Sequence, residues 1–423
     1  MATAGLVLVP TGGAVAAPAR VLGYVANNGG GVSVFDAATN TVTSTIADPD
    51  GNSPYNVGVA FDGTRGYVTN LLDNSLTVID TPTGTVDANI AVGAHPAGVV
   101  VSPDGGHVYV TNYADGTVSV VDVALGATTA TIAVGPNADG IAITPNGKTL
   151  YVAHDVAGPG TVSVVDTATN LEVAEVATGN TPTAVAVTPD GAKVLVVNKF
   201  SDNVAVLATA TNTVVGTIPV SFVPHGVAIS PDGTRAYVTN SEGDTLSVLD
   251  IPAMAPVGSV AMGDRPIGVS LNPDGSRAYV ANYNTGTVSV VDTATLATVA
   301  SIGVGSHPVG VAIHAVPAAP TKLVVAGSAT LQLRLAGFAV KGLNAKLTES
   351  HTGRAVVGAQ VVFTTIKGNP LCSAKTDANG VAKCDAVVPP LVGLSTLLRG
   401  YTASFAGTPE YSASTSHGFL RLL

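Results

Sequence analysis

A tetrapeptide that recurs about every 42 residues constrains the fold of this chain more than any other feature. Tyr-Val-Thr-Asn or Tyr-Val-Ala-Asn begins at Tyr24, Tyr67, Tyr109, Tyr237 and Tyr279, and degenerate copies begin at Tyr151 and Leu195. Successive copies are 43, 42, 42, 44, 42 and 42 residues apart. A period near 42 with four short strands per unit is typical of a β-propeller, so the sequence predicts an all-β fold.

One unit shows how the four strands arise. Residues 226–229 form a short apolar run, and Ser-Pro-Asp-Gly follows at 230–233, where proline presets φ and glycine supplies a positive φ. Residues 235–239, 246–249 and 257–260 are three further short runs suited to strands. The other six units repeat this plan, so we expect a seven-bladed propeller.

The two ends of the repeat region complement each other. The inner-strand motif occurs once more at 309–313 without a following hairpin, whereas the first unit, which starts near Val21, has no inner strand of its own. A ring left open would expose two unpaired strand edges, and such edges promote aggregation. We therefore expect the propeller to span 21–314 and strand 309–313 to close it.

Charge divides the chain into two parts. The formal net charge is −10, but residues 1–318 carry 8 Lys and Arg against 24 Asp and Glu, whereas residues 319–423 carry 10 against 4. Opposite charge balances indicate two domains. A nucleic-acid partner is not expected, because phosphate contacts require a basic face. Mean hydropathy is +0.43, yet no apolar run reaches the roughly 18 residues of a membrane span, so we do not expect a transmembrane protein. We expect the protein to be a monomer.

The period stops after the linker 315–320. Seven short strand-like runs follow within 321–423, which predicts an immunoglobulin-like (Ig-like) β-sandwich. Segments 358–364 and 372–384 resemble bacterial Ig-like repeat domains, and that resemblance implies a stalk or spacer. The runs are 322–325, 330–335, 343–348, 359–364, 380–388, 401–405 and 412–423.

Both cysteines, Cys372 and Cys384, lie in this second domain. Asp-Ala-Asn-Gly at 377–380 predicts a hairpin turn between them, which would place the cysteines on facing strands within reach of a disulfide. A disulfide would imply an oxidising compartment. Two free buried thiols are the alternative.

The first 20 residues have some features of an export signal. Residues 4–9 are apolar, and Ala14-Val15-Ala16 offers a small-x-small cleavage site. No Lys or Arg precedes Arg20, so the signal is atypical, and a plain apolar tail is the alternative. Together with the expected disulfide, this segment predicts an extracellular or cell-surface protein.

The repeats also carry a family resemblance. Tyr-Val-Thr-Asn, with Ser-Pro-Asp-Gly upstream and Val-Ser-Val-Val-Asp downstream, resembles the YVTN-type β-propeller repeats of surface-layer and secreted prokaryotic proteins over about 22–314. The resemblance implies an adhesion or interaction role and supplies no activity. Related propellers include sugar lactonases, streptogramin lyases and the propeller domain of nitrous oxide reductase, so an enzyme stays open.

Loops from each outer strand to the next inner strand should rim a central channel, the usual ligand site of propellers. The residues at fixed positions just before and at the start of each inner strand are therefore predicted to form a ligand-binding rim. We assign no catalytic residue, metal or cofactor. An anion or carboxylate site, with an arginine fork and switchable histidine donors, is the functional interpretation, and solvated strand ends are the alternative. The candidate rim residues are Tyr55, His95, Asp139, His225, Arg265 and His307.

Other polar positions follow the repeat too regularly to mark a catalytic site. The repeat asparagines are expected to bond the backbone of the following loop, and the aspartates that end each third strand to form Asx turns. His154 replaces a repeat asparagine and is interpreted as a local cap.

These observations favour an exported, non-enzymatic interaction or adhesion protein. The propeller would bind a protein or glycan, and the basic Ig-like domain would act as spacer or tether, resting weakly on an anionic cell envelope. The alternative is a secreted propeller enzyme, lactonase- or lyase-like, with its site at the channel mouth.

Overall fold

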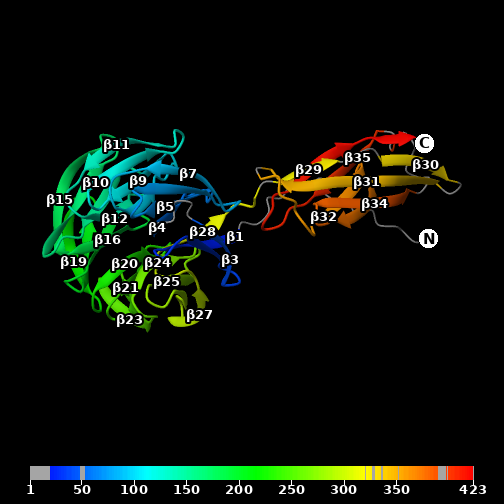
Figure 1. Cartoon of the computed structure of the whole chain (residues 1–423). Coiled ribbons are helices and arrows are strands. Elements are labelled where there is room, and N and C mark those ends of the chain that lie inside the picture. Colours follow the sequence, from blue (N-terminus) through cyan, green and yellow to red (C-terminus); the bar gives the residue numbers. More distant parts are fainter. Residues whose placement is uncertain are drawn as a thin grey trace. The chain divides into compact units, whose positions relative to one another are not determined.

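The computed structural model describes residues 20–47, 53–319, 321–325, 329–334, 337–350, 352–388, 397 and 399–422. The chain divides into two compact units: one comprises Val21–Val316, and the other comprises Pro317–Leu423 together with Met1–Arg20. The expected export signal, except for Arg20, lies outside the described residues. Figure 1 shows the elements of both units.

Within its described residues, the first unit consists of seven four-stranded antiparallel sheets, which we call blades. The first three blades contain β28 (Pro308–Val316), β1 (Arg20–Asn27), β2 (Val32–Asp36) and β3 (Thr41–Ile46); β4 (Pro54–Val59), β5 (Arg65–Asn70), β6 (Ser75–Asp80) and β7 (Thr85–Ala91); and β8 (Pro96–Val101), β9 (His107–Asn112), β10 (Thr117–Asp122) and β11 (Ala127–Ala133).

The remaining four blades follow the same order from inner to outer strand. They contain β12 (Ala138–Ile143), β13 (Thr149–His154), β14 (Pro159–Asp166) and β15 (Leu171–Asn180); β16 (Pro182–Val187), β17 (Lys193–Asn198), β18 (Asn203–Ala208) and β19 (Thr213–Pro219); β20 (Pro224–Ile229), β21 (Arg235–Asn240), β22 (Thr245–Asp250) and β23 (Ala255–Ala261); and β24 (Pro266–Leu271), β25 (Arg277–Asn282), β26 (Thr287–Asp292) and β27 (Ala297–Gly303).

The inner strands form a closed cycle. β28 lies beside β1, so the first blade takes its inner strand from the far end of the unit. Around the centre, β28, β4, β8, β12, β16, β20 and β24 each contact the next strand, and β24 contacts β28 again. Outer strands such as β15, β19 and β23 lie at the perimeter (Figure 1).

The core of this unit lies between blades. In each blade the second and third strands are almost wholly buried, whereas the outer strand exposes most of its residues, as β21, β22 and β23 illustrate. A strand that is buried on both faces has an almost wholly apolar sequence, which explains why valine is so frequent in the repeats. The motif tyrosines extend this packing, because the Tyr279 hydroxyl donates to the Ala37 carbonyl of the next blade at 3.4 Å.

The repeat asparagines differ from expectation. Their side-chain amides donate mainly to hydroxyls on the neighbouring strand, as Asn112 Nδ2 does to Ser119 Oγ at 2.9 Å and Thr117 Oγ1 at 2.9 Å. Only some also reach the loop backbone, as Asn27 Nδ2 reaches the Gly31 carbonyl at 3.3 Å. The loop after the motif is short, so the facing strand is the nearer source of acceptors.

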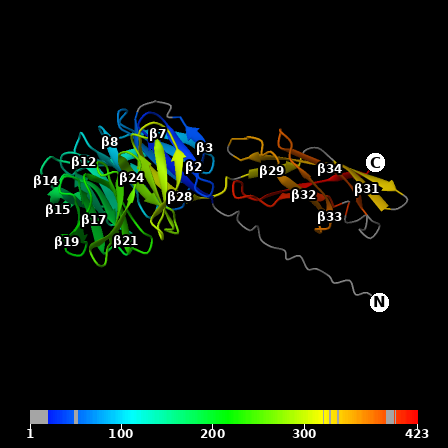
Figure 2. The same cartoon turned by 90° about the horizontal axis from the view of Figure 1, so that it is seen from below.

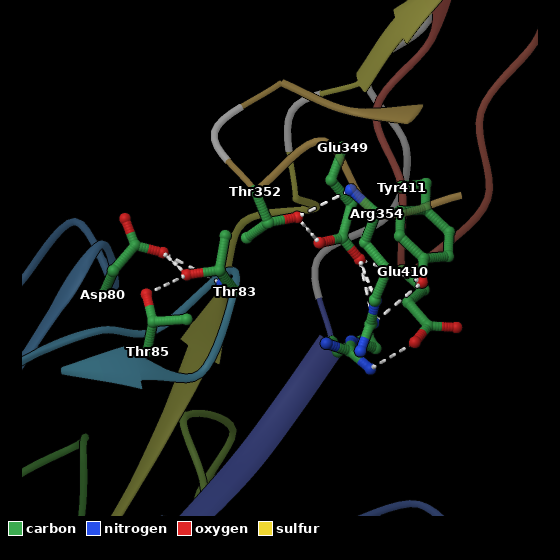
Figure 3. Close-up of polar contacts among 9 residues, drawn as sticks. Asp80, Thr83, Thr85, Glu349, Thr352, Arg354, Glu410 and Tyr411 are labelled. Carbon is green, nitrogen blue, oxygen red and sulfur yellow. Dashed lines mark hydrogen bonds and ion pairs between the residues drawn. The ribbon is translucent and has the colours of Figure 1, made fainter. Parts of the chain in front are cut away.

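The Asx turns after the third strands are confirmed. Asp80 Oδ1 accepts from the Thr83 backbone N–H at 2.9 Å and from its hydroxyl, which also bonds Thr85 (Figure 3). Asp166 and Asp292 cap their turns in the same way. These carboxylates are structural, because they hold the turn to the outer strand.

The second unit contains two sheets (Figure 2). In one, β31 (Gly337–Glu349) pairs with β29 (Thr321–Val325), β30 (Ala329–Arg334) and β34 (Val381–Val388), and β30 also pairs with β37 (Leu420–Leu422). The other has the order β33 (Pro370–Lys375), β32 (Gln360–Thr365), β35 (Tyr401–Phe405), β36 (Ser414–Gly418). One apolar core, which includes Val340, Leu343, Val361, Phe363 and Tyr401, takes side chains from both sheets.

The cysteines form the expected disulfide, with Cα atoms 6.4 Å apart. The expected hairpin is wrong in one respect, because Cys372 is in β33 and Cys384 in β34, which belong to different sheets. Residues 377–380 do form a turn, in which Asp377 Oδ1 accepts from the N–H groups of Asn379 and Val381 at 2.9 Å. This turn carries the chain from one sheet to the other, so the disulfide joins the two layers.

A buried carboxylate is fully partnered in this unit. Glu349 is 4% exposed and accepts from Arg354 Nε at 3.0 Å, from the Thr352 hydroxyl at 2.6 Å and from the Tyr411 hydroxyl at 3.4 Å (Figure 3). A charge with this many partners has a structural role. Within the described residues, no helix is long and apolar enough to cross a bilayer.

Candidate functional site at the channel mouth

The inner strands shape the channel through close backbone contacts. Most of them have a register shift near their first residues, as β12 has between Ala138 and Ile141. At these points a glycine lies against the next blade: a Cβ on Gly226 would meet the Ile267 carbonyl oxygen at 2.4 Å. A larger residue would not fit at Gly226, although β4 and β16 carry Asn56 and Ala184 at the equivalent position.

Threonines fasten these strands to one another. The Thr239 hydroxyl accepts from the Gly226 N–H at 2.8 Å and donates to the Ile267 carbonyl of the next blade at 2.6 Å. Thr111 makes the same link to the Asp139 carbonyl, also at 2.6 Å. The threonine of the repeat motif therefore sets the position of the channel-lining backbone, a role that the sequence did not suggest.

Two overlapping cavities lie at the centre of the ring. The inner one, of about 180 Å³, is lined by the side chains of Tyr55, Asp139, Thr183 and His225 and by surrounding backbone. The second, of about 260 Å³, shares Tyr55 and His225 and adds Arg265, Tyr283, Asn28 and Leu71.

The six candidate rim residues divide into two groups. Tyr55, Asp139 and His225 line the inner cavity, and Arg265 lies with Tyr55 and His225 at the second cavity. His95 and His307 are exposed and line neither cavity. His307 nonetheless contacts the group, because its ring lies 4.7 Å from that of Tyr283, and the Arg265 guanidinium carbon lies 5.1 Å from the same ring.

The residue that precedes each inner strand has a left-handed backbone. His95 has φ of 52°, Val223 of 53° and Arg265 of 58°, values that non-glycine residues seldom adopt. The carbonyl of this residue accepts from the backbone N–H just beyond the repeat asparagine, as His95 O does from Tyr113 N at 3.0 Å. The pattern recurs around the ring. The seven positions are Ser53, His95, Asn137, Thr181, Val223, Arg265 and His307.

Sequence reasoning missed a second set of residues, those that directly follow each repeat asparagine. Their N–H groups bond the left-handed residues, and several of their side chains reach the channel mouth. The signal was available: this position varies in chemistry, whereas the motif before it stays nearly constant. We call these the mouth residues: Asn28, Leu71, Tyr113, Asp155, Lys199, Ser241 and Tyr283.

Burial and neighbouring charge perturb the acidic groups of the site. Burial, together with Asp155, raises the pKa of Asp139 to about 7, although Lys199 opposes the shift. The Asp139 charge, burial and the Asp155 charge raise the pKa of Tyr55. Tyr55 is therefore a neutral hydroxyl at physiological pH, and Asp139 exchanges a proton near neutrality.

His225 is shifted in the opposite direction. Burial lowers its pKa to about 4, and the positive charges of Lys199 and Arg265 act in the same sense. Its imidazole is thus neutral at pH 7 and offers one donor and one acceptor. The Thr183 hydroxyl fixes the backbone by donating to the His225 carbonyl at 3.2 Å.

His154 takes the place of a repeat asparagine and acts as the expected local cap, because its ring bonds to groups of the neighbouring loop and strand. It is 2% exposed, its Nδ1 lies 3.0 Å from the Pro136 carbonyl oxygen, and its Nε2 lies 2.7 Å from Ser163 Oγ. Burial lowers its pKa. Both ring nitrogens are engaged within the fold, so His154 serves structure. Across the described part of the chain, no three His, Cys, Asp or Glu residues lie where they could hold a metal ion.

Two family models match parts of the chain. The Cytochrome D1 heme domain matches residues 63–189, and the YNCE-like beta-propeller matches residues 157–241. Comparison with curated proteins finds no match. Within the first match, His154 is not free to bind a haem iron, because both of its ring nitrogens bond within the fold.

Solved structures show the same fold at low identity. Hydrazine synthase of Kuenenia stuttgartiensis is 24% identical with a TM-score of 0.57, and the match covers 61% of this chain and 88% of that one. A functionally unknown protein of Desulfotomaculum acetoxidans is 20% identical with a TM-score of 0.61 and coverage of 70% and 99%. A candidate 6-phosphogluconolactonase of Bacteroides uniformis is 18% identical with a TM-score of 0.60 and the same coverage. These likenesses and the family models confirm an all-β chain with a propeller.

Proposed function

We propose that this chain is an exported or cell-surface interaction protein. A seven-bladed propeller binds a protein or glycan ligand at the channel mouth, and an Ig-like domain acts as spacer or tether. The closed cycle of seven inner strands supports the blade number, and the two sheets around one core support the Ig-like assignment. The disulfide supports an oxidising compartment.

The observation that carries the proposal is where the repeats diverge. Motif side chains that hold the blades together recur around the ring, whereas the mouth residues beside them include two tyrosines, an aspartate and a lysine. Repeat scaffolds commonly place their binding surface where the repeat is least constrained by packing. Partly exposed Tyr113 and Tyr283 suit stacking on a ligand, because tyrosine combines an apolar ring with a polar tip.

A sedimentation assay with cell envelopes of the producing organism tests the proposal. The full chain should pellet with envelopes, and Tyr113→Ala/Tyr283→Ala should reduce the bound fraction about tenfold or more. Glu242→Gln, which removes an exposed charge beside a mouth residue, should bind normally. Protease-treated and periodate-treated envelopes separate a protein ligand from a glycan. Unchanged binding by the double-tyrosine variant would refute the proposed site.

A secreted lactonase- or lyase-like enzyme is the second candidate. In its favour, two titratable groups in one cavity, Asp139 and His225, have pKa values displaced in opposite directions. Hydrolysis of glucono-δ-lactone by the purified chain separates the two candidates. A rate that disappears in Asp139→Asn and His225→Ala would favour the enzyme, whereas equal rates in all three proteins would favour the binding module.

A further inference from the structure

Three tyrosines and two carboxyls from four blades lie around the channel, and Asp139, Asp155, Tyr113 and Tyr283 all lie near enough to influence Tyr55. Tyr55 and Asp139 line the inner cavity, and Tyr283 joins Tyr55 at the second. Tyr113 and Asp155 lie near enough that the charge of Asp155 influences both Tyr113 and Tyr55. Aromatic faces beside carboxylates are the surroundings that organic cations prefer in proteins.

Asp139 has no partner of its own in this cluster. Its side chain is 7% exposed and lines the cavity, yet among the described residues no hydrogen bond reaches its carboxyl oxygens. The carboxyl therefore faces the cavity, where a ligand, an ion or water can reach it. The Thr111 hydroxyl holds only its backbone carbonyl, so the carboxyl stays available to the cavity.

The neighbouring cations do not neutralise this carboxyl. Arg265 lies over the Tyr283 ring, and the Lys199 ammonium lies 5.5 Å from the centre of the exposed Phe200 ring. No ion pair joins either cation to Asp139 or Asp155 in the described part of the chain. An anionic ligand in the inner cavity would instead meet the Asp139 carboxyl and the neutral imidazole of His225.

We propose that the channel mouth binds an organic ammonium group, primary or quaternary, with Asp139 as its counter-ion and Tyr55 and Tyr283 as its aromatic walls. The inference rests on the proposed function, since it names the chemistry of the ligand that the interaction module takes. A compact trimethylammonium or primary ammonium head suits a cavity of about 180 Å³. The rest of the ligand would extend past Arg265 and the other mouth residues.

The proposal has a distinctive pH dependence. The groups that face Asp139 are Asp155 and Lys199, with Tyr55 and Tyr113 beside it and His225 across the cavity. The pKa of Asp139 is about 7 in the free protein, so an ammonium ligand must displace a proton below that pH. Affinity should fall about tenfold from pH 8 to pH 6 for a ligand whose own charge does not change.

Choline and its uncharged carbon isostere, 3,3-dimethylbutan-1-ol, provide a matched pair of probes. Binding to the full chain can be followed by calorimetry and by tyrosine fluorescence, because the chain contains no tryptophan. Choline should bind at least tenfold more tightly than the isostere at pH 8. Asp139→Asn should remove both this preference and the pH dependence, and Tyr283→Ala should weaken choline binding by about 3–30-fold. Glu242→Gln should change neither.

Equal affinity for the two probes, or a preference for choline that persists in Asp139→Asn, would overturn the inference. Should Asp139→Asn lose the thermal transition of the native protein, Asp155→Asn gives a second test, with a smaller loss expected. Absence of choline binding while envelope binding still depends on Tyr113 and Tyr283 would overturn the ammonium site alone. Loss of both results would overturn the proposed function as well.

Discussion

At the residue scale, the repeat motif divides structural positions from chemically variable ones. Its threonine bonds the next blade and its asparagine bonds the neighbouring strand, as Thr239 and Asn240 do. The next residue contributes its backbone N–H in every blade, as Tyr283 does to the Arg265 carbonyl, and Ser241 adds a bond from its hydroxyl to the Val223 carbonyl. Its side chain is therefore free to differ from blade to blade without loss of packing.

Thr239→Val tests the structural half of this division. The hydroxyl accepts from the Gly226 N–H and donates to the Ile267 carbonyl, so an isosteric methyl group leaves both unpaired. We expect a loss of about 1–3 kcal/mol in the free energy of unfolding, measured in urea. The control Thr213→Val, on an exposed outer-strand position, should stay within about 0.5 kcal/mol. Equal effects of the two substitutions would contradict the link between blades.

Asp139→Asn tests the chemical half through stability. The native pKa of about 7 lies above the usual 3.8, so the folded protein holds this proton more tightly than the unfolded chain does. The resulting stability is present below about pH 4 and is lost as pH rises towards 7. The free energy of unfolding of the variant, relative to that of the wild type, should rise by about 2–4 kcal/mol between pH 4 and pH 8. A difference that does not vary with pH in urea titrations would refute the raised pKa.

The sequence predicts part of this site and misses part for a physical reason. Counting along the repeat predicts that Tyr55, Asp139 and His225 lie at the channel, because equivalent positions of a repeat occupy equivalent places around the ring. It does not predict that His95 and His307 line neither cavity, since their left-handed backbone depends on hydrogen bonds to another loop. Lys199 and Asp155 occupy the variable position after the repeat asparagine, but the sequence does not tell which of those seven side chains reach the channel.

At the element scale, each blade is stable only against its neighbours. Seven apolar clusters among the described residues each combine strands of two adjacent blades, as Val25 and Phe35 pack with Tyr279 and Val290. The cluster between the last and first blades also contains Val311 and Ile313 of β28. Strand periodicity predicts the four strands of each blade, whereas the sheet boundary at Cys372 and Cys384 depends on tertiary packing.

Deletion of 309–313 tests the closure of the ring. It removes most of β28, exposes the edge of β1 and takes Val311 and Ile313 from a buried cluster. Unpaired edges and lost burial should leave the protein aggregated, with the soluble fraction falling at least tenfold. Centrifugation and size-exclusion chromatography measure this. A soluble, cooperatively unfolding monomer from this deletion would reject the closure scheme.

At the scale of the whole molecule, two units of different construction share one chain. The first gains its stability from a ring of inter-blade clusters, whereas the second has a single core and a disulfide between its sheets. Their charges also differ in sign, since residues 319–423 carry 10 Lys and Arg against 4 Asp and Glu. We therefore expect the two units to unfold in separate transitions.

Removal of the disulfide should affect one transition only. The bond closes a loop with a sequence separation of 12, worth about 3 kcal/mol in the chain-entropy treatment. For a unit of about 100 residues this lowers the melting temperature by about 10–20 °C. Calorimetry of Cys372→Ala/Cys384→Ala should show that shift in one transition and leave the melting temperature of the propeller unchanged. Wild-type protein treated with a reductant should give the same result. A shift of both transitions together would mean that the units unfold as one, because a link between β33 and β34 can reach the propeller only through coupling of the units.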